Sequence, residues 1–346
     1  MARLISHAPP LAQSTLISVV SCIAGTLKGR YGIDPVPVMN SVGIDPIVIQ
    51  DSDRRLTVAT LSPLWLRCVE VTGDEAFGLY AARYYQPAQF YGVDLALCTA
   101  ATFGEALQLH VQFIRVLTTA ALASLKTDAD GNHRLEIHRY GPDRPTDAAL
   151  DCFFHAFFIR LFERQTGLQV NKLLRRLELP RAAPNDPTPW LDLGIPVVFG
   201  SPCGAMVFKP QAWALPLPGA NPLLLAQLEK PILRQLAQLR LPLPASALRA
   251  LLADTLASGA SLEQLALALQ ISASQLRSGL RSQGLNFSQL LDQAREAQAM
   301  VLLANPAFSL EQIATKLGFS GSSSFNRAFR RWQGDTPLNY RRQVLG

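Results

Sequence analysis

Residues 318–332, near the C-terminus, read GFSGSSSFNRAFRRW. Phe325, Phe329 and Trp332 recur on one helix face, so the end of this stretch is predicted to be an amphipathic helix packed against a core. Residues 309–317 predict a short helix before it. Gly318 is predicted to make the tight turn between the two helices, because glycine reaches positive φ at little cost. Ser320 is predicted to cap the second helix.

Two short helices joined in this way are typical of a helix-turn-helix motif, whose second helix lies in the DNA major groove. The same pattern occurs earlier, with helices predicted at 261–269, where a capping box begins the first, and at 273–283. Residues 287–304 predict a connecting helix that ends at Asn305-Pro306. At about 1.5 Å per residue it is roughly 27 Å long. With its flanking turns it can separate two reading helices by about 34 Å, one turn of DNA.

The outer face of the second reading helix carries the groups that suit base edges. Arg327 is predicted to dominate specificity because the arginine fork reads guanine, whereas Asn326 suits adenine and the short Ser322 and Ser323 make only close contacts. Arg330 and Arg331 are predicted to bind phosphate, and the alternative for either is a solvated charge.

Residues 250–342 resemble the DNA-binding domain of the AraC family of bacterial transcription regulators. The motifs that carry the resemblance are Ser261-Leu262-Glu263, Ser272, Leu276, Gly284-Leu285-Asn286-Phe287, Arg295, Ile313-Ala314, Leu317-Gly318-Phe319-Ser320, Phe325, Arg327 to Trp332, Gly334, Pro337 and Tyr340-Arg341. The resemblance implies that base reading falls on the same four residues of the second unit.

In the first unit the resemblance places the reading positions on Ser274, Arg277 and Ser278, with Arg281 one turn beyond Arg277. This unit departs from the family pattern, because Ser278-Gly279 stands where a basic residue is usual. Glycine within a helix costs about 1 kcal/mol relative to alanine and adds no contact. We therefore expect the first unit mainly to anchor the protein through Arg277 and Arg281.

Residues 1–210 predict an α+β domain with more helix than strand. Helical patterns occur at 11–28, 56–72, 75–85, 103–125, 146–166 and 187–193, and strand patterns at 133–140 and 173–179. Residues 197–208 are predicted to form a hairpin around Gly200-Ser201-Pro202.

This region resembles the N-terminal effector-binding and dimerisation domain of the AraC subgroup found in ornithine-utilisation and several virulence regulators. The motifs that match are Val42 to Asp45, Thr72-Gly73-Asp74, Phe77-Gly78-Leu79, Thr102 to Leu107, Ile195 to Gly200 and Pro216-Leu217-Pro218. The resemblance implies a small-molecule effector and a homodimer.

The chain as a whole is predicted to be mainly α, with three parts. These are the effector-binding and dimerisation domain at 1–210, a Pro-rich linker at 211–245, and the DNA-binding domain at 246–346 with its two helix-turn-helix units. Within the linker, leucine and isoleucine at 225, 228, 232, 236 and 239 form an apolar seam. The seam is interpreted either as a dimer helix or as a face that packs on its own domain.

Composition favours a compact protein with a polyanionic partner. The 346 residues are 49% hydrophobic and carry a net charge of +6, and residues 309–346 hold six basic residues against two acidic ones. The five scattered cysteines are typical of a reducing cytosol, and no apolar run approaches the length of about 18 residues needed to span a membrane.

Signals for catalysis are weak, so we predict no enzyme, no cofactor and no metal. None of the five histidines stands in a metal-binding spacing, and His133 and His138 are predicted to lie on opposite faces of one strand. Asp151 and His155 are predicted to form a local hydrogen bond within a helix.

The sequence therefore indicates a cytoplasmic transcription regulator that binds double-stranded promoter DNA as a homodimer. Activation and repression both stay open, and RNA polymerase is a further partner if the protein is an activator. The alternative is an N-terminal domain that binds a protein and no ligand. An aromatic set is interpreted mainly as core rather than as the wall of a ligand pocket, and its members are Phe90, Tyr91, Phe113, Phe153, Phe154, Phe157, Phe158 and Phe162.

Overall fold

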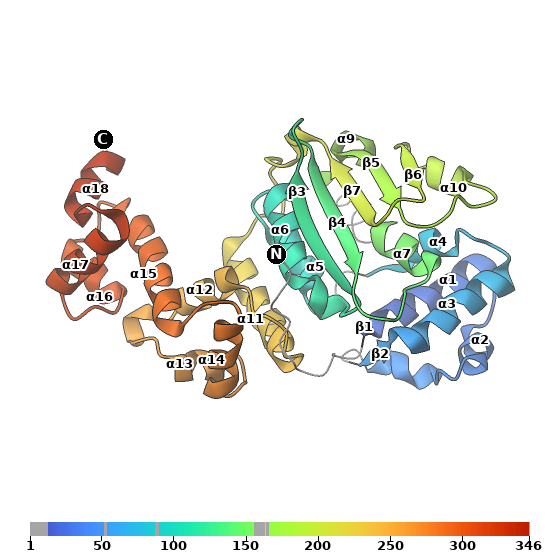
Figure 1. The fold of residues 1–346 in the computed structure, drawn as a ribbon, viewed down its shortest axis with the longest axis horizontal. Coiled ribbons are helices and arrows are strands. Elements are labelled where there is room, and N and C mark those ends of the chain that lie inside the picture. The colour runs from blue at the N-terminus through green and yellow to red at the C-terminus, as the bar shows by residue number, and fades with distance from the viewer. Residues whose placement is uncertain (1–12, 52–53, 87–89, 156–162, 164–165, 346) are drawn as a thin grey trace. The chain divides into compact units, whose positions relative to one another are not determined.

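The computed structural model describes residues 13–51, 54–86, 90–155, 163 and 166–345 (Figure 1). Its internal contacts divide the chain into two compact units, and the boundary falls between Ile232 and Leu233. This boundary lies within helix α11 (Pro222–Gln238), inside the segment predicted as a linker. Among the described residues no helix combines the length and the apolar character that a membrane span requires.

The N-terminal unit contains a five-stranded sheet in the order β3-β4-β7-β5-β6. The strands are β3 (Ala121–Thr127), β4 (His133–Arg139), β5 (Leu174–Leu179), β6 (Val197–Phe199) and β7 (Gly204–Phe208). All neighbours are antiparallel except β5 and β6, which are parallel. A second, two-stranded sheet pairs β1 (Ser14–Leu16) with β2 (Arg55–Thr57).

The predicted hairpin at 197–208 is wrong, because β5 lies between β6 and β7 and pairs with both. The loop after β6 explains the crossing. Gly200 and Ser201 donate their backbone N–H groups to the carbonyls of Arg181 and Leu179, which follow or end β5. The chain thus crosses from one side of β5 to the other before β7 begins.

Two helices are also shorter than the sequence pattern predicts. The helix expected at 103–125 ends at Leu117, because Thr118 and Thr119 are extended or bonded to the β1 segment, and β3 follows. The helix expected at 11–28 begins only at Ser18, since Ser14–Leu16 pairs with β2. In both cases strand pairing with a distant segment overrides the local helical pattern.

Helices lie beside these sheets in Figure 1. They are α1 (Ser18–Tyr31), α2 (Pro35–Ser41), η1 (Pro46–Gln50), α3 (Val58–Thr72), α4 (Phe77–Ala81), η2 (Ala82–Tyr84), α5 (Val93–Thr99), α6 (Phe103–Leu117), α7 (Asp147–Phe154), α9 (Val170–Leu173), α10 (Thr188–Leu191) and η5 (Pro210–Ala212). The rings of Phe103 on α6 and Phe208 on β7 meet edge to face with centroids 5.1 Å apart, so α6 packs on the sheet.

The described part of the C-terminal unit is helical throughout. After α11 come α12 (Ala245–Ala253), η6 (Leu256–Ser258), α13 (Leu262–Ala268), α14 (Ala273–Ser282), α15 (Phe287–Leu303), α16 (Leu310–Lys316), α17 (Ser322–Gln333) and α18 (Pro337–Leu345). The predicted fold class is confirmed: an α+β domain is followed by a helical domain with two helix-turn-helix units, α13–α14 and α16–α17, joined by α15.

The apolar seam of α11 differs in burial along its length. Ile232 and Leu236 are 0% and 1% exposed, and Leu225, Leu228 and Leu239 are half-buried. Both interpretations of this seam, the dimer helix and the face that packs on its own domain, stay predictions.

Candidate nucleic-acid interface

The second helix-turn-helix unit is built on the apolar stripe that the sequence predicts. Phe325 and Phe329 of α17 are fully buried, and they pack with Ile313 of α16 and with Leu317, which follows that helix. Trp332 packs against the same cluster and is half-buried. The buried stripe fixes the rotation of α17 about its axis, so its other faces are presented to solvent.

The turn between α16 and α17 is held by two features. Gly318 has φ of +71°, and a Cβ at this position would collide with the carbonyl oxygen of Leu256. Arg295 of α15 donates to the carbonyls of Leu317 (Nε, 3.0 Å) and Gly318 (Nη2, 3.1 Å), while its guanidinium lies 4.6 Å from the ring centroid of Phe319. Burial lowers the pKa of Arg295. Arg295 therefore positions the reading helix from within the domain.

The predicted cap of α17 is wrong. The residue that precedes the helix is Gly321, in extended backbone with φ of 166°, and a glycine has no side chain to accept a hydrogen bond. Ser320 lies one position too early and sits 3.4 Å from the Ser324 hydroxyl instead. By contrast, α13, α14, α15 and α16 all begin with a capping box.

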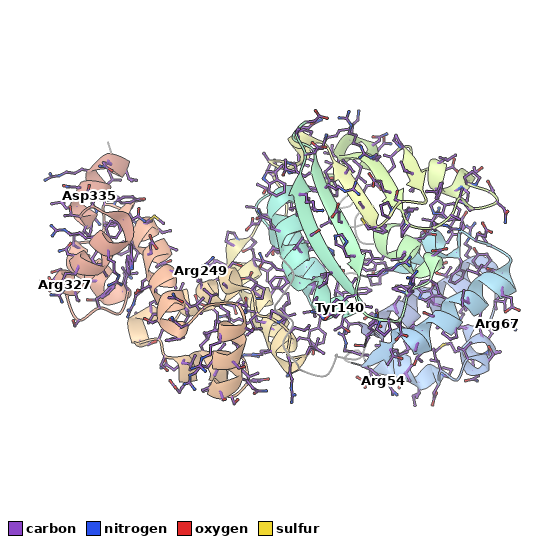
Figure 2. The ribbon with its side chains drawn as sticks, in the orientation of Figure 1. Arg54, Arg67, Tyr140, Arg249, Arg327 and Asp335 are labelled. Atoms are coloured by element: carbon purple, nitrogen blue, oxygen red, sulfur yellow. The ribbon has the colours of Figure 1, made fainter. Side chains whose placement is uncertain are left out.

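The predicted contact residues of α17 lie outside the core. Arg327, at the labelled position in Figure 2, is exposed, as are Ser323, Arg330 and Arg331, whereas Ser322 and Asn326 are half-buried. The helix thus carries its hydroxyl, amide and guanidinium groups on faces that a DNA groove can reach.

Arg331 has a partner that the sequence did not reveal. Its Nη2 atom lies 2.8 Å from Oδ2 of Asp292 on α15. One turn further along α15, Glu296 accepts a 2.6 Å hydrogen bond from Gln333. The end of α17 is therefore tied to the connecting helix, and a phosphate would compete with Asp292 for the Arg331 guanidinium.

In the first unit, Leu276 and Leu280 of α14 are buried. The predicted contact residues Ser274, Arg277, Ser278 and Arg281 are all exposed. The turn before α14 differs from that in the second unit, because Gln270 adopts a positive φ of 57° where the second unit has Gly318. A residue with a Cβ is strained in this conformation. Sequence inspection missed this strain because the turn carries no glycine.

Two other clusters lie in the N-terminal unit. Glu136, His138 and Cys203 offer metal-ligand atoms within 4.8 Å of one another, but the Glu136 carboxylate is already held by Lys126 (2.7 Å) and Arg134 (2.8 Å). These partners keep the pKa of Glu136 low, at about 2, against the opposing effect of burial. The carboxylate is thus charge-compensated within the protein.

The hydrogen bond predicted between the Asp151 and His155 side chains is replaced by a longer-range contact. Oδ2 of Asp151 accepts from Nη1 of Arg181 at 2.7 Å, and both side chains are buried. Burial raises the pKa of Asp151 to about 6 even though Arg181 opposes the shift. The pairing was missed because Arg181 lies in a different segment of the chain.

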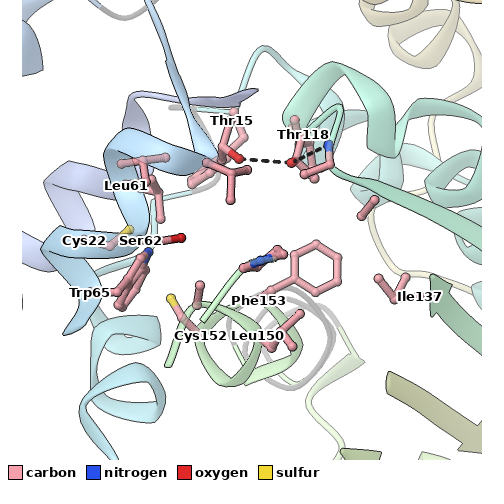
Figure 3. A pocket seen from close by; sticks show the side chains of 18 of the residues that line it. Thr15, Cys22, Leu61, Ser62, Trp65, Thr118, Ile137, Leu150, Cys152 and Phe153 are labelled. Atoms are coloured by element: carbon pink, nitrogen blue, oxygen red, sulfur yellow. Dashed lines mark hydrogen bonds between the residues drawn. The ribbon is translucent and has the colours of Figure 1, made fainter. Parts of the chain in front are cut away.

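The described members of the aromatic set differ in their surroundings. Phe113 and Phe154 are buried in the core, and Tyr91 is half-buried. Phe90 and Phe153 line a cavity of about 130 Å³ in the N-terminal unit, which Figure 3 shows. Phe157, Phe158 and Phe162 lie outside the described residues.

Comparisons with known proteins agree with this architecture. Residues 32–217 match the model for the arabinose-binding domain of AraC transcription regulators, and residues 265–343 match a helix-turn-helix domain. The ornithine utilization regulator of Pseudomonas aeruginosa is 26% identical over 318 residues, which cover 91% of this chain and 93% of that protein. The transcriptional regulator VirS of Mycobacterium tuberculosis is 42% identical over 81 residues, 23% of this chain and 24% of VirS.

Among solved structures, the transcriptional regulator CdpR of Pseudomonas aeruginosa superposes with a TM-score of 0.56 at 23% identity, covering 88% of this chain and 96% of CdpR. This similarity shows a shared fold. The matched family and the relatives are transcription regulators and not enzymes. The N-terminal family model alone spans more than half of the residues of this chain. The chain therefore belongs to the AraC family of DNA-binding transcription regulators.

Proposed function

We propose that this regulator binds promoter DNA through α14 and α17, which enter two successive major grooves. The observation that carries the proposal is that each helix buries its apolar stripe and exposes a polar face within one helical domain. The connecting helix α15 has 17 residues and is therefore about 25 Å long. With its flanking turns it matches the spacing of about 34 Å between successive major grooves.

The two helices make different kinds of contact with DNA. On α17, Ser322, Ser323, Asn326 and Arg327 face the bases, and Arg330 and Arg331 face phosphates. On α14, Ser274 and Ser278 offer only short hydroxyls, while Arg277 and Arg281 anchor the protein to the backbone. The basic excess of residues 309–346 attracts DNA before any base is read.

The N-terminal unit binds a small molecule that controls this activity. Support comes from the match to an arabinose-binding domain, from the name of the ornithine utilization regulator and from the cavity beside Phe153. The protein acts in the cytoplasm as a homodimer, and it contacts RNA polymerase if it is an activator.

Footprinting of genomic DNA with the full chain tests the DNA-binding part. One chain is expected to protect two major grooves about one helical turn apart. Protection of a single groove would contradict the use of α14 as a second reading helix.

Native mass spectrometry of the freshly purified protein tests ligand binding and assembly. A dimer that carries a small metabolite supports the proposal. A chain that repeatedly carries a protein partner and no metabolite would favour the alternative, an N-terminal protein-interaction domain.

A further inference from the structure

The cavity of the N-terminal unit has walls from several elements. Val19 and Cys22 come from α1, Trp65 from α3, and Leu150 and Phe153 from α7. Figure 3 shows Trp65 and Phe153 among the side chains that surround the space. Because these residues are distant in sequence, the cavity exists only in the folded unit.

Among the described residues that line this cavity, no side chain carries a charge. Its polar side-chain groups are the hydroxyls of Thr15, Ser62, Tyr85 and Thr118, the thiols of Cys22 and Cys152 and the indole N–H of Trp65. Burial raises the pKa of Cys22 to about 12, so this thiol is neutral. The lining therefore behaves as an apolar surface with a few neutral hydrogen-bonding groups.

The hydroxyls are partly engaged with the protein. Thr15 and Thr118 share a hydrogen bond of 3.0 Å, drawn as a dashed line in Figure 3, and Ser62 donates to the carbonyl of Arg144 at 3.4 Å. Arg55 bonds to the strand that carries Thr15, but its guanidinium is committed to Ser14 and to the carbonyls of Val116 and Leu117. The threonine pair can still accept one hydrogen bond from a ligand.

Such a lining rejects strongly polar ligands. An amino acid such as ornithine would bring several charges into the cavity without a partner, which costs several kcal/mol per charge. A sugar would leave most of its hydroxyl groups without hydrogen bonds, at about 1–3 kcal/mol each. A ligand with one polar group loses only one contact with water and regains it at the threonine pair.

The volume of the cavity further limits the class of ligand that it can hold. The cavity of about 130 Å³ is close to the engineered protein cavity of about 150 Å³ that binds benzene. A single ring with one or two small substituents fills this space, and the rings of Trp65, Tyr85, Phe90 and Phe153 offer it aromatic contacts.

We infer that the effector of this regulator is an uncharged, mainly apolar molecule of single-ring size with one hydroxyl group, held in this cavity. The inference rests on the proposed control of the protein by a small molecule. It departs from the sugar and the amino acid that the names of the matched family model and of the relative suggest.

The test uses the full chain and p-cresol as the probe, with binding measured by titration calorimetry. We expect p-cresol to bind with at least 100-fold higher affinity than L-ornithine or L-arabinose. Ala149→Phe places a ring in the cavity and should abolish p-cresol binding. The matched control is Ala59→Phe on exposed α3 surface, which should leave binding unchanged.

Thr15→Val tests the single polar contact and keeps the side-chain shape. It should weaken p-cresol binding about five- to tenfold, the effect of one neutral hydrogen bond. Toluene binding should remain the same. Thermal melts of each variant establish that a loss of binding does not come from unfolding.

The outcomes separate this inference from the proposed function. Preferential binding of L-ornithine or L-arabinose, or p-cresol binding that survives Ala149→Phe, would overturn the inference while leaving effector control intact. If the inferred class binds as expected but shifts operator affinity for none of its members, the cavity assignment stands and the proposed control fails.

Discussion

Arg327 and Arg331 leave the same helix one turn apart and meet different surroundings. Arg327 is exposed, whereas Arg331 forms an ion pair with Asp292 on the connecting helix. The two side chains look equivalent in the sequence, yet Asp292 competes with DNA for the guanidinium of Arg331. We therefore expect the two residues to affect DNA binding in different ways, Arg327 through base specificity and Arg331 through phosphate contacts.

Arg327→Ala should weaken operator binding by about 1–3 kcal/mol and binding to random DNA by little, because a base contact is lost and phosphate contacts remain. Fluorescence anisotropy with both DNAs measures the difference, with Arg342→Ala on α18 as the control for loss of one exposed charge. An unchanged ratio of operator to random affinity would mean that α17 is docked differently.

Asp292→Asn should release Arg331 and strengthen binding to operator and to random DNA alike. The salt dependence should steepen by about one phosphate contact. Protein stability should fall by at most about 1 kcal/mol, because the pair is exposed. Salt titrations of affinity provide the measurement.

Glu296→Gln is the matched control for this experiment. It removes the same charge from α15, but its carboxylate accepts from Gln333 and holds no arginine. If both variants strengthened binding equally, the gain would come from net charge alone and Arg331 would not be the residue released.

At the scale of elements, one glycine in each helix-turn-helix unit has a different structural role. Gly318 lies in a turn with positive φ and close to the Leu256 carbonyl, whereas Gly279 lies within α14. In the described part of the chain, a Cβ added at Gly279 would meet no atom within 4 Å. Only the first glycine is required by the fold.

Gly279→Ala should therefore raise the free energy of unfolding by about 0.5–1 kcal/mol, because alanine restricts the unfolded chain and favours helix. Gly318→Ala should lower it by more than 1 kcal/mol through strain and collision. Urea denaturation of the full chain gives both values. Destabilisation by Gly279→Ala would indicate that α14 is not helical at this position.

The two reading helices should also differ in base preference. α17 offers Asn326 and Arg327, whereas α14 offers serines and two arginines beside Gly279. Base-pair substitutions in the half-site under α17 should cost about 1–3 kcal/mol each, and those under α14 should cost less. A substitution scan of the operator checks this. Equal costs in both halves would mean that Arg277 reads bases.

At the scale of the whole molecule, a carboxyl group on α11 makes stability depend on pH. Burial, with a smaller repulsion from Glu105 of α6, raises the pKa of Glu229 to about 7. In the unfolded chain the ordinary value is about 4.5. Between these values the folded protein keeps a proton that the unfolded chain releases, so this contribution to stability is full below pH 4.5 and is lost as pH rises to 7.

Glu229→Gln should leave the melting temperature unchanged at pH 4.5 and raise it at pH 8. The gain at pH 8 should be roughly 1–2 kcal/mol, because the carboxyl is partly exposed and solvent screens it. Melting curves across this range, with the exposed Glu263→Gln as control, provide the measurement. A uniform gain at all pH values would show that the effect is not electrostatic.

The sequence by itself determined the helix-turn-helix units. The apolar stripe Phe325, Phe329 and Trp332, the turn at Gly318 and the capping box at Ser261 each act within a few residues of chain. Such signals depend on backbone sterics and local hydrogen bonds, and they can be read without knowing the rest of the fold. The faces of α14 and α17 followed from them.

Only the tertiary structure decided the features that join distant segments. These include the insertion of β5 between β6 and β7, the pairing of Arg331 with Asp292 and the cavity that Trp65 and Phe153 share. Each depends on which segments meet in space. That choice is made by burial and strand pairing summed over the whole unit, so no single stretch of sequence carries it.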